Sequence, residues 1–432
     1  MLRPYTERLL GNTLKDLVRR GTLEVTLPGG RRQVFGDGAA PRAAIRFTDD
    51  RAVRALLMDP DLRLGELFMD GRLAVDEGSV YDVLELLLRD AGAVQPGAAV
   101  RLLDAVRMSI RRFLQNNRPG RSRANVAHHY DLDDRLYALF LDDERQYSCA
   151  YFEQPGLSLE QAQRAKQRHI AAKLLVEPGH RVLDIGCGWG GLTRYLVEIA
   201  GAAHATGITL SSEQLKGARD LAARTAHPQA YEYRLEDYRA TRGRFDRIVS
   251  VGMFEHVGTG FHDTFFRKCH QLLADDGVML LHFIGNSDVP DFNNPWIEKY
   301  IFPGGHIPSM SEFTPAIERS GLVITDIEVL RLHYAQTLRL WRERFLARRA
   351  EAVALYDERF ARMWEYYLSM SETAFRYQDI AIFQVQLARR QESVPLTRDY
   401  VGQREAALRQ AEERADSTPA AEPGRAQILM NM

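Results

Sequence analysis

The residues from Val182 to Gly191 read VLDIGCGWGG, an apolar run that leads directly into a turn rich in glycine. Glycine has no Cβ and accepts positive φ, so such a turn lets the backbone approach a ligand closely. In an open α/β sheet, a turn of this kind lies at the carboxyl end of a parallel strand, where cofactors bind. The segment therefore predicts a strand, a ligand-binding turn and the start of a helix.

An acidic residue, Asp184, stands two positions before the first glycine of this turn, Gly186. A dinucleotide-binding turn usually carries an apolar residue there. A carboxylate at this place suits a ligand with positive charge, because opposite charges attract most strongly at short range. S-adenosylmethionine (AdoMet) has a cationic sulfonium and an ammonium group, and we interpret the turn as an AdoMet site. The alternative is a structural strand-to-helix turn without a ligand.

The composition is ordinary for a globular protein: of 432 residues, 45% are hydrophobic and 27% are charged, with a net charge of −1. No nucleic acid partner is expected from that balance. No apolar run is long enough to span a bilayer, and the charged N-terminus does not resemble a signal peptide. Cys149, Cys187 and Cys269 are far apart and odd in number, which favours reduced thiols in the cytoplasm and no metal site.

Positive charge is concentrated in one stretch of the chain. Between Arg101 and Asn125 there are seven arginines and a single acidic residue, Asp104. Apolar residues recur there at helical spacing, at Leu103, Val106, Ile110, Phe113 and Leu114. Such a helix suits the surface of an anionic membrane. It equally suits a packed helix with a solvated basic face, followed by a polar linker at 116–123.

The elements that must position these residues form a small N-terminal α+β domain and a larger α/β domain. In the first, strands are predicted at 23–27 and 44–47 and helices at 64–73 and 80–88. From about 125, strands alternate with helices, which predicts a parallel sheet. Its strands are expected at 181–185, 204–210, 230–234, 245–252, 277–284, 322–330 and 380–387. The domains are assigned to 1–118, to 119–395 with a helical insertion at 335–376, and to 396–432, a C-terminal helix and disordered tail.

Four further segments bring polar residues to the same edge of the predicted sheet. They read YSCAYF at 147–152, GITLSSEQ at 207–214, GMFEHVG at 252–258 and LHFIG at 281–285. Together with DIGCGWGG at 184–191, and in chain order, these segments resemble the cyclopropane-fatty-acyl-phospholipid synthases, to which the mycolic acid cyclopropane synthases are related. The resemblance extends over nearly the whole chain, the N-terminal domain included.

The resemblance implies a class I methyltransferase fold, a Rossmann-like seven-stranded, mostly parallel sheet whose last strand is antiparallel. It implies AdoMet as the donor of a methylene group. The acceptor would be the cis double bond of an unsaturated acyl chain in a membrane phospholipid. It also implies ring closure through a carbocation that bound bicarbonate deprotonates. Such chemistry needs an apolar channel, π density or negative charge near the cation, and a base.

By the same resemblance, bicarbonate is held by Cys149, Glu255, His282, Ile284 and Tyr334, and each of these positions carries the family's residue. Glu255 and His282 end two consecutive predicted strands, so both should face one crevice. Because a carboxylate repels an anion, Glu255 is expected to orient His282 or to accept the bicarbonate hydroxyl. The backbone amides of Cys149 and Ile284 are expected to bind the anion.

The resemblance also assigns the residues that contact AdoMet. They are Tyr147, Ser148, Asp184, Gly186, Gly188, Gly190, Thr209 and Gln214, with Glu236 or Asp237 at the adenine amino group. Gln214 is expected at the ribose. Trp296, Tyr300 and Phe302 are expected to line the acyl channel together with the helices of 335–376, although core packing explains aromatic residues equally well.

Other interpretations of these residues stay open. Cys149 suits a buried apolar position, His282 a core histidine with satisfied hydrogen bonds, and Glu255 the N-terminus of a helix. Other functions also fit: a sister enzyme that makes branched chains, a methyltransferase for a small amine or phenol, or a lipid-binding protein without activity. The N-terminal domain is expected to contact either the bilayer or a second copy of the chain in a homodimer. The enzyme is expected in the cytoplasm, peripheral to the inner face of the cytoplasmic membrane.

Overall fold

The computed structural model describes residues 2–91, 98–114 and 132–417. Its larger sheet has seven strands in the order β10-β11-β9-β8-β5-β6-β7. Strands β5 to β9 run parallel, and β11, the last in the chain, lies between β9 and β10 and is antiparallel to both. This arrangement confirms the predicted sheet. The strands are β5 (Arg181–Ile185), β6 (His204–Thr209), β7 (Tyr231–Leu235), β8 (Phe245–Val251), β9 (Leu273–Asn286), β10 (Val323–Leu330) and β11 (Ile380–Ala388).

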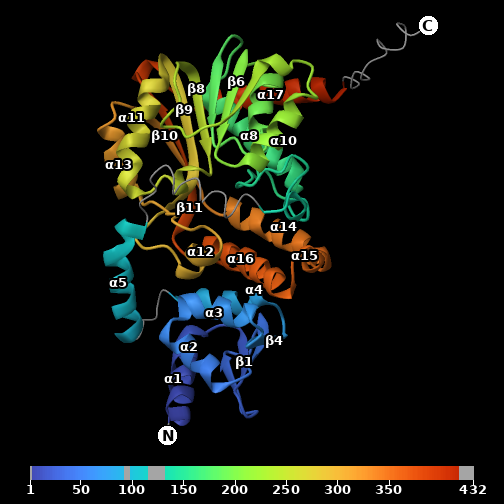
Figure 1. Ribbon diagram of the computed structural model, residues 1–432, viewed down its shortest axis with the longest axis vertical. Helices are drawn as coiled ribbons and strands as arrows, with labels where there is room; N and C mark the ends of the chain where they lie inside the picture. Colours follow the sequence, from blue (N-terminus) through green and yellow to red (C-terminus); the bar gives the residue numbers. More distant parts are fainter. Residues whose placement is uncertain (1, 92–97, 115–131, 418–432) are drawn as a thin grey trace, which may run out of the picture.

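Helices flank this sheet (Figure 1). N-cap residues stabilise the first turns of two of them. Ser158 and Gln161 form a capping box at the start of α8, and the Ser211 hydroxyl accepts from the Gln214 amide at the start of α10. The flanking helices are α8 (Leu159–Leu174), α9 (Gly191–Glu198), α10 (Ser212–Ala222), α11 (His262–Leu272), α13 (Met310–Glu318) and α17 (Asp399–Ser417). α17 packs on α8 and corresponds to the predicted C-terminal helix.

The N-terminal domain is an α+β unit with a four-stranded sheet in the order β2-β1-β3-β4. The prediction of a helix over 64–73 is wrong at both ends. The helix begins earlier, at Pro60, and ends at Met69, because Gly71 adopts a positive φ and Leu73 already begins a strand. The elements are α1 (Leu2–Leu17), β1 (Thr22–Thr26), β2 (Arg32–Gly36), β3 (Arg42–Phe47), α2 (Asp50–Met58), α3 (Pro60–Met69), β4 (Leu73–Glu77) and α4 (Val80–Leu88).

A layer of helices lies between the large sheet and the N-terminal domain (Figure 1). It contains α12 (Pro295–Tyr300), α14 (His333–Ala347), α15 (Arg349–Leu355) and α16 (Glu358–Tyr377), and α16 packs on α3 and α4. One hydrophobic cluster runs through both parts, from Phe47 to Trp341 and Trp364. The helices found within 335–376 therefore connect the large sheet with the N-terminal domain.

The aromatic residues of the loop after β9 have different surroundings. Trp296 is fully buried, with its Nε1 3.3 Å from the Met69 sulfur, and the Tyr300 hydroxyl donates to Glu66 at 2.9 Å. Both therefore hold α12 against the N-terminal domain. Of these three aromatic residues, Phe302 lies beside His256, with 5.6 Å between the two rings.

The basic stretch begins in α5 (Ala98–Leu114), which stands at the edge of the molecule (Figure 1). Arg107 turns inward, where its guanidinium pairs with Asp59 at 2.7 Å. Arg107 is therefore not available to a membrane surface. The predicted linker at 116–123 and nearly all of the predicted tail lie outside the described residues. Within the residues described, no helix is both long and apolar enough to cross a membrane.

Candidate functional site

The turn between β5 and α9 can be made only with glycine at critical points. Gly186 and Gly190 have φ of 87° and 86°, a region that side chains with a Cβ rarely adopt. A Cβ on Gly186 would lie 2.9 Å from the Met253 Cβ, and one on Gly190 would lie 2.6 Å from the Tyr233 hydroxyl. The turn therefore brings the backbone close to the chain that follows β8, and it leaves an open cavity on its other side.

Asp184 ends β5 beneath this turn and is 2% exposed. Its Oδ2 accepts from the Thr193 hydroxyl at 2.8 Å. Burial raises the pKa of Asp184 to about 7, because the charged carboxylate loses its water. A cationic ligand would favour the ionised form, which fits the predicted role of this carboxylate.

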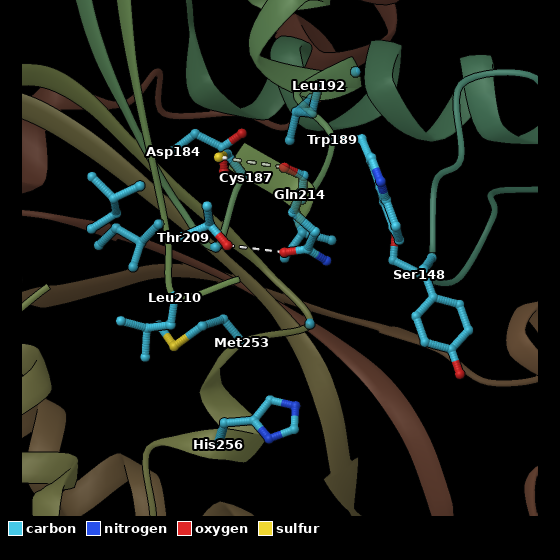
Figure 2. Close-up of a pocket in the computed structure, with 18 of the residues that line it drawn as sticks. Ser148, Asp184, Cys187, Trp189, Leu192, Thr209, Leu210, Gln214, Met253 and His256 are labelled. Carbon is cyan, nitrogen blue, oxygen red and sulfur yellow. Dashed lines mark hydrogen bonds between the residues drawn. The ribbon is translucent and has the colours of Figure 1, made fainter. Parts of the chain in front are cut away.

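The end of β6 contributes a second polar group to the cavity. The Thr209 hydroxyl donates to Gln214 Oε1 at 2.9 Å, and Figure 2 shows the two side chains joined in this way. This bond uses the side-chain oxygen of Gln214, so its side-chain nitrogen Nε2 can donate to a ligand. After β7, Glu236 accepts from the Thr241 hydroxyl at 2.7 Å, whereas Asp237 pairs with Arg239 at 2.6 Å.

These residues surround one cavity of about 1170 Å³, its open mouth included. Its lining combines apolar side chains with a few polar groups, as is usual for the site of a small ligand or cofactor. Of the predicted AdoMet contacts, all but Gly190 line it: Tyr147, Ser148, Asp184, Gly186, Gly188, Thr209, Gln214, Glu236 and Asp237. Gly190 instead begins α9 behind the turn, against Tyr233.

Several lining residues were not predicted from the sequence: Lys166, Trp189, Leu192, Leu210, Met253 and His256. Lys166 matters most for charge. It is 2% exposed, and its ammonium donates to the Ser148 hydroxyl at 2.7 Å. Burial lowers the pKa of Lys166 to about 8. The sequence did contain a sign that Lys166 is buried. It lies four residues after Ala162 and four before Ile170, on the apolar face of α8.

The five residues assigned to bicarbonate do not line this cavity but lie next to it. Glu255 is in η3 (Phe254–His256), directly after β8, and its Oε1 accepts from the Ile284 amide at 2.7 Å. Its Oε2 is buried without a hydrogen-bond partner. Burial raises the pKa of Glu255 to about 7, so the carboxyl is partly protonated near neutral pH.

His282 lies two residues before Ile284 on β9 and is 1% exposed. Its Nδ1 is 3.1 Å from Gln384 Nε2, and its Nε2 is buried without a partner. Burial and the neighbouring cation Lys166 hold the pKa of His282 well below its usual value, so the imidazole is neutral. Glu255 and His282 each leave one polar atom for a ligand, as expected at a binding site.

Cys149 lies in the segment before α8, and Tyr334 lies in the first turn of α14. Burial raises the pKa of the Cys149 thiol, so it stays protonated and is no nucleophile. The Thr337 hydroxyl of α14 accepts from the Ala150 amide at 3.0 Å and so fixes this segment beside Tyr334. The expectation for Ile284 needs correction, because its only backbone donor already binds Glu255. Ile284 therefore acts through Glu255 and not through an amide aimed at the anion.

Comparison with known proteins shows the family to which the chain belongs. Residues 117–385 match the family described as mycolic acid cyclopropane synthetase, and residues 9–96 match a domain family of unknown function. The chain is 38% identical over 353 residues to cyclopropane-fatty-acyl-phospholipid synthase of Escherichia coli, which covers 82% of this chain and 89% of that protein. It is 35% identical over 397 residues to tuberculostearic acid methyltransferase UfaA1 of Mycobacterium tuberculosis, which covers 86% of this chain and 90% of that protein.

A solved structure shows the same fold. Mycolic acid cyclopropane synthase CmaA1, complexed with SAH and CTAB, has a TM-score of 0.58 and 35% identity, covering 61% of this chain and 97% of that chain. The family match covers most of the chain and includes the glycine-rich turn, the Glu255 segment and His282. The chain therefore belongs to the mycolic acid cyclopropane synthetase family, and it is an AdoMet-dependent methyltransferase.

Proposed function

We propose that this enzyme transfers a methylene group from AdoMet to the cis double bond of an unsaturated phospholipid acyl chain and closes a cyclopropane ring. The observation that carries the proposal is the pair of unpartnered buried atoms, Glu255 Oε2 and His282 Nε2, beside a cavity suited to AdoMet. The related structure of CmaA1 with SAH supports the assignment of that cavity.

The reaction explains why a polar pair is needed inside an apolar site. The alkene electrons attack the AdoMet methyl carbon, the carbon–sulfur bond breaks toward sulfur, and a carbocation remains on the acyl chain. A proton must then leave the added methyl group, so that the electrons of that C–H bond close the ring. A well-placed base is required for this step.

The residues present fit a small anion that both donates and accepts hydrogen bonds. A neutral His282 and a carboxyl with a pKa near 7 can present one donor and one acceptor, and Lys166 supplies positive charge nearby. Bicarbonate held by Cys149, Glu255, His282 and Tyr334, with Ile284 acting through Glu255, would supply the base that takes the proton. The Glu255 carboxyl, when protonated, does not repel it.

Aromatic side chains exclude water from the place where the carbocation forms on the acyl chain. The Tyr147 ring lies 5.2 Å from Trp341, the Tyr334 ring lies 4.7 Å from Phe375, and the hydroxyls of Tyr147 and Tyr367 are 2.7 Å apart. Their π faces stabilise positive charge without acting as bases. The layer formed by α14 and α16 thus supplies the apolar wall that the carbocation requires.

Incubation with methyl-labelled AdoMet and vesicles of cis-monounsaturated phospholipid tests this function. We expect mass spectrometry to show a gain of one CH2, and proton NMR to show upfield cyclopropane signals with loss of the alkene protons. A saturated, unlabelled acyl chain would serve as the control. The absence of label in lipid would leave a lipid-binding protein without this activity.

A second candidate is a sister enzyme that makes a methyl- or methylene-branched chain. The 35% identity to tuberculostearic acid methyltransferase favours keeping this alternative. Its product would also gain label but would retain an alkene, or become a branched saturated chain after reduction. The same NMR spectrum separates the two, because only ring closure produces the cyclopropane signals.

We further propose that α5 touches an anionic bilayer, at the inner face of the cytoplasmic membrane. Leu102 is 69% exposed and Val106, one turn later, is 49% exposed. Arg101 is exposed beside them, and the sequence adds five arginines between 111 and 123. Such a helix combines apolar contact with attraction to acidic head groups.

Replacing both Leu102 and Val106 by Ser should weaken binding to anionic vesicles by roughly tenfold or more, because both apolar contacts are lost. Flotation at several salt concentrations measures this, and wild-type binding should fall as salt screens the arginines. Leu396→Ser is a matched control, since Leu396 is fully exposed in the segment between β11 and α17. Equal flotation of the double variant and the wild type would show that α5 does not bind the membrane and only packs against the protein.

A further inference from the structure

Gln384 is a buried amide that contacts His282 from the neighbouring strand. The two residues are paired directly across the antiparallel register of β11 and β9, and both are at most 1% exposed. Gln384 Nε2 lies 3.1 Å from His282 Nδ1. The proposed reaction gives Gln384 no direct part, yet it is the hydrogen-bond partner of the one His282 nitrogen that faces away from the ligand.

The other end of the same amide is held by a lysine. Lys173 Nζ, on α8, is 2.9 Å from Gln384 Oε1, and Lys173 is 1% exposed. An ammonium group donates and never accepts. The oxygen of the amide must therefore face Lys173, because the reverse orientation would set NH2 against ammonium. The contact fixes which end of Gln384 points at His282.

A carboxylate near the surface favours the protonated, cationic form of Lys173. The lysine contacts Glu328 of β10, and Glu328 also accepts from His169 at 2.7 Å. Burial opposes the charge of Glu328, but His169 and Lys173 hold its pKa well below the usual range. The second ring nitrogen of His169 is 2.6 Å from Glu405 of α17. Burial lowers the pKa of Lys173, and the ionised Glu328 opposes that shift and favours the ammonium form.

The consequence for His282 follows from donor and acceptor matching. Gln384 presents N–H to Nδ1, so Nδ1 must accept, and in a neutral imidazole the proton then resides on Nε2. Nε2 is the atom that is buried without a protein partner. His282 therefore aims an N–H at its ligand and selects an oxygen acceptor, such as the oxygen of an anion.

We propose that Gln384 and Lys173 are positioning residues that set the tautomer of His282 with its proton on Nε2, and so make the site a receptor for an oxyanion. The proposal rests on the proposed function in assigning His282 to the reaction. It adds that two residues without contact to the reacting atoms determine the hydrogen-bonding character of that side chain.

The Gln384→Glu variant tests this directly. A carboxylate beside Lys173 only accepts, so His282 must move its proton to Nδ1 to satisfy it. We expect long-range proton–nitrogen spectra of protein with isotope-labelled histidine to show Nε2–H in the wild type and Nδ1–H in the variant. The His282→Gln variant identifies the signal by its disappearance. Turnover on unsaturated vesicles should fall at least about tenfold, while AdoMet affinity is kept.

Gln386→Glu is the matched control, because Gln386 lies two residues along the same strand and its amide binds the Lys173 carbonyl at 2.6 Å without contacting His282. That variant should keep the Nε2–H tautomer. Thermal melting establishes that each variant is folded. If Gln384→Glu does not fold, Gln384→Met removes the donor without adding charge and should give a mixture of the two tautomers.

Three results would overturn the proposal: Nδ1–H in the wild type, an unchanged tautomer in every folded Gln384 variant, or a changed tautomer with wild-type turnover. Failure of the proposed function is distinguishable from all three. A wild type that modifies no lipid but shows Nε2–H, with the change in Gln384→Glu, would reject the reaction and retain the positioning role.

Discussion

Replacement of Glu255 by Gln should lower turnover by roughly two orders of magnitude or more, the usual scale for acid–base groups, and His282→Ala should do the same. Each substitution changes a buried group that has an unpartnered polar atom beside the AdoMet cavity. The measurement is the initial rate of label transfer from methyl-labelled AdoMet to unsaturated vesicles. Because neither residue lines that cavity, AdoMet affinity by calorimetry should change little.

Asp184→Asn is the matched control for this prediction, since it makes the same acid-to-amide change inside the cavity. It should weaken AdoMet binding, because the amide cannot compensate a cationic ligand. The two variants therefore separate binding from proton removal. Full activity of Glu255→Gln in bicarbonate-replete buffer would show that the anion site is wrongly placed.

Replacement of Arg168 by Met should lower the free energy of unfolding by about 3 kcal/mol, because it leaves a buried carboxylate without its main cation. Arg168 of α8 and Glu412 of α17 are 5% and 4% exposed, and two guanidinium nitrogens bind the carboxylate at 3.0 and 2.8 Å. Tyr195 also donates to Glu412, but a neutral hydroxyl does not balance its charge, and the second cation, Arg164, is farther away at 3.5 Å and 37% exposed. Denaturant unfolding followed by circular dichroism measures the change.

Arg409→Met provides the comparison, because Arg409 belongs to the same network at the surface. It pairs with Glu153 at 2.8 Å, but its side chain is 45% exposed. Exposed pairs of this kind contribute about 1 kcal/mol or less. Equal destabilisation by the two variants would mean that burial of the Arg168–Glu412 pair does not govern how α17 is held to α8.

The local pattern of the chain predicted the sheet and its ligand-binding edge. Apolar runs bounded by turns gave the positions of β5 to β8 within about two residues, because a strand buried on both faces needs continuous apolar side chains. β9 was predicted too short, since it begins at Leu273 and continues past Ile284. In the N-terminal domain, the short strand β4 was not predicted, and the predicted helix extended as far as its first residue, Leu73.

By itself, the sequence determined the glycine-rich turn, Asp184 and the positions of the parallel strands, since these depend on neighbouring residues and their periodicity. Only the tertiary structure decided how those side chains are used. Lys166 enters the cavity, Arg107 turns away from solvent, and Gln384 meets His282 from 102 residues away. No local pattern encodes these pairings, because each arises when two distant segments pack and every buried donor must find an acceptor.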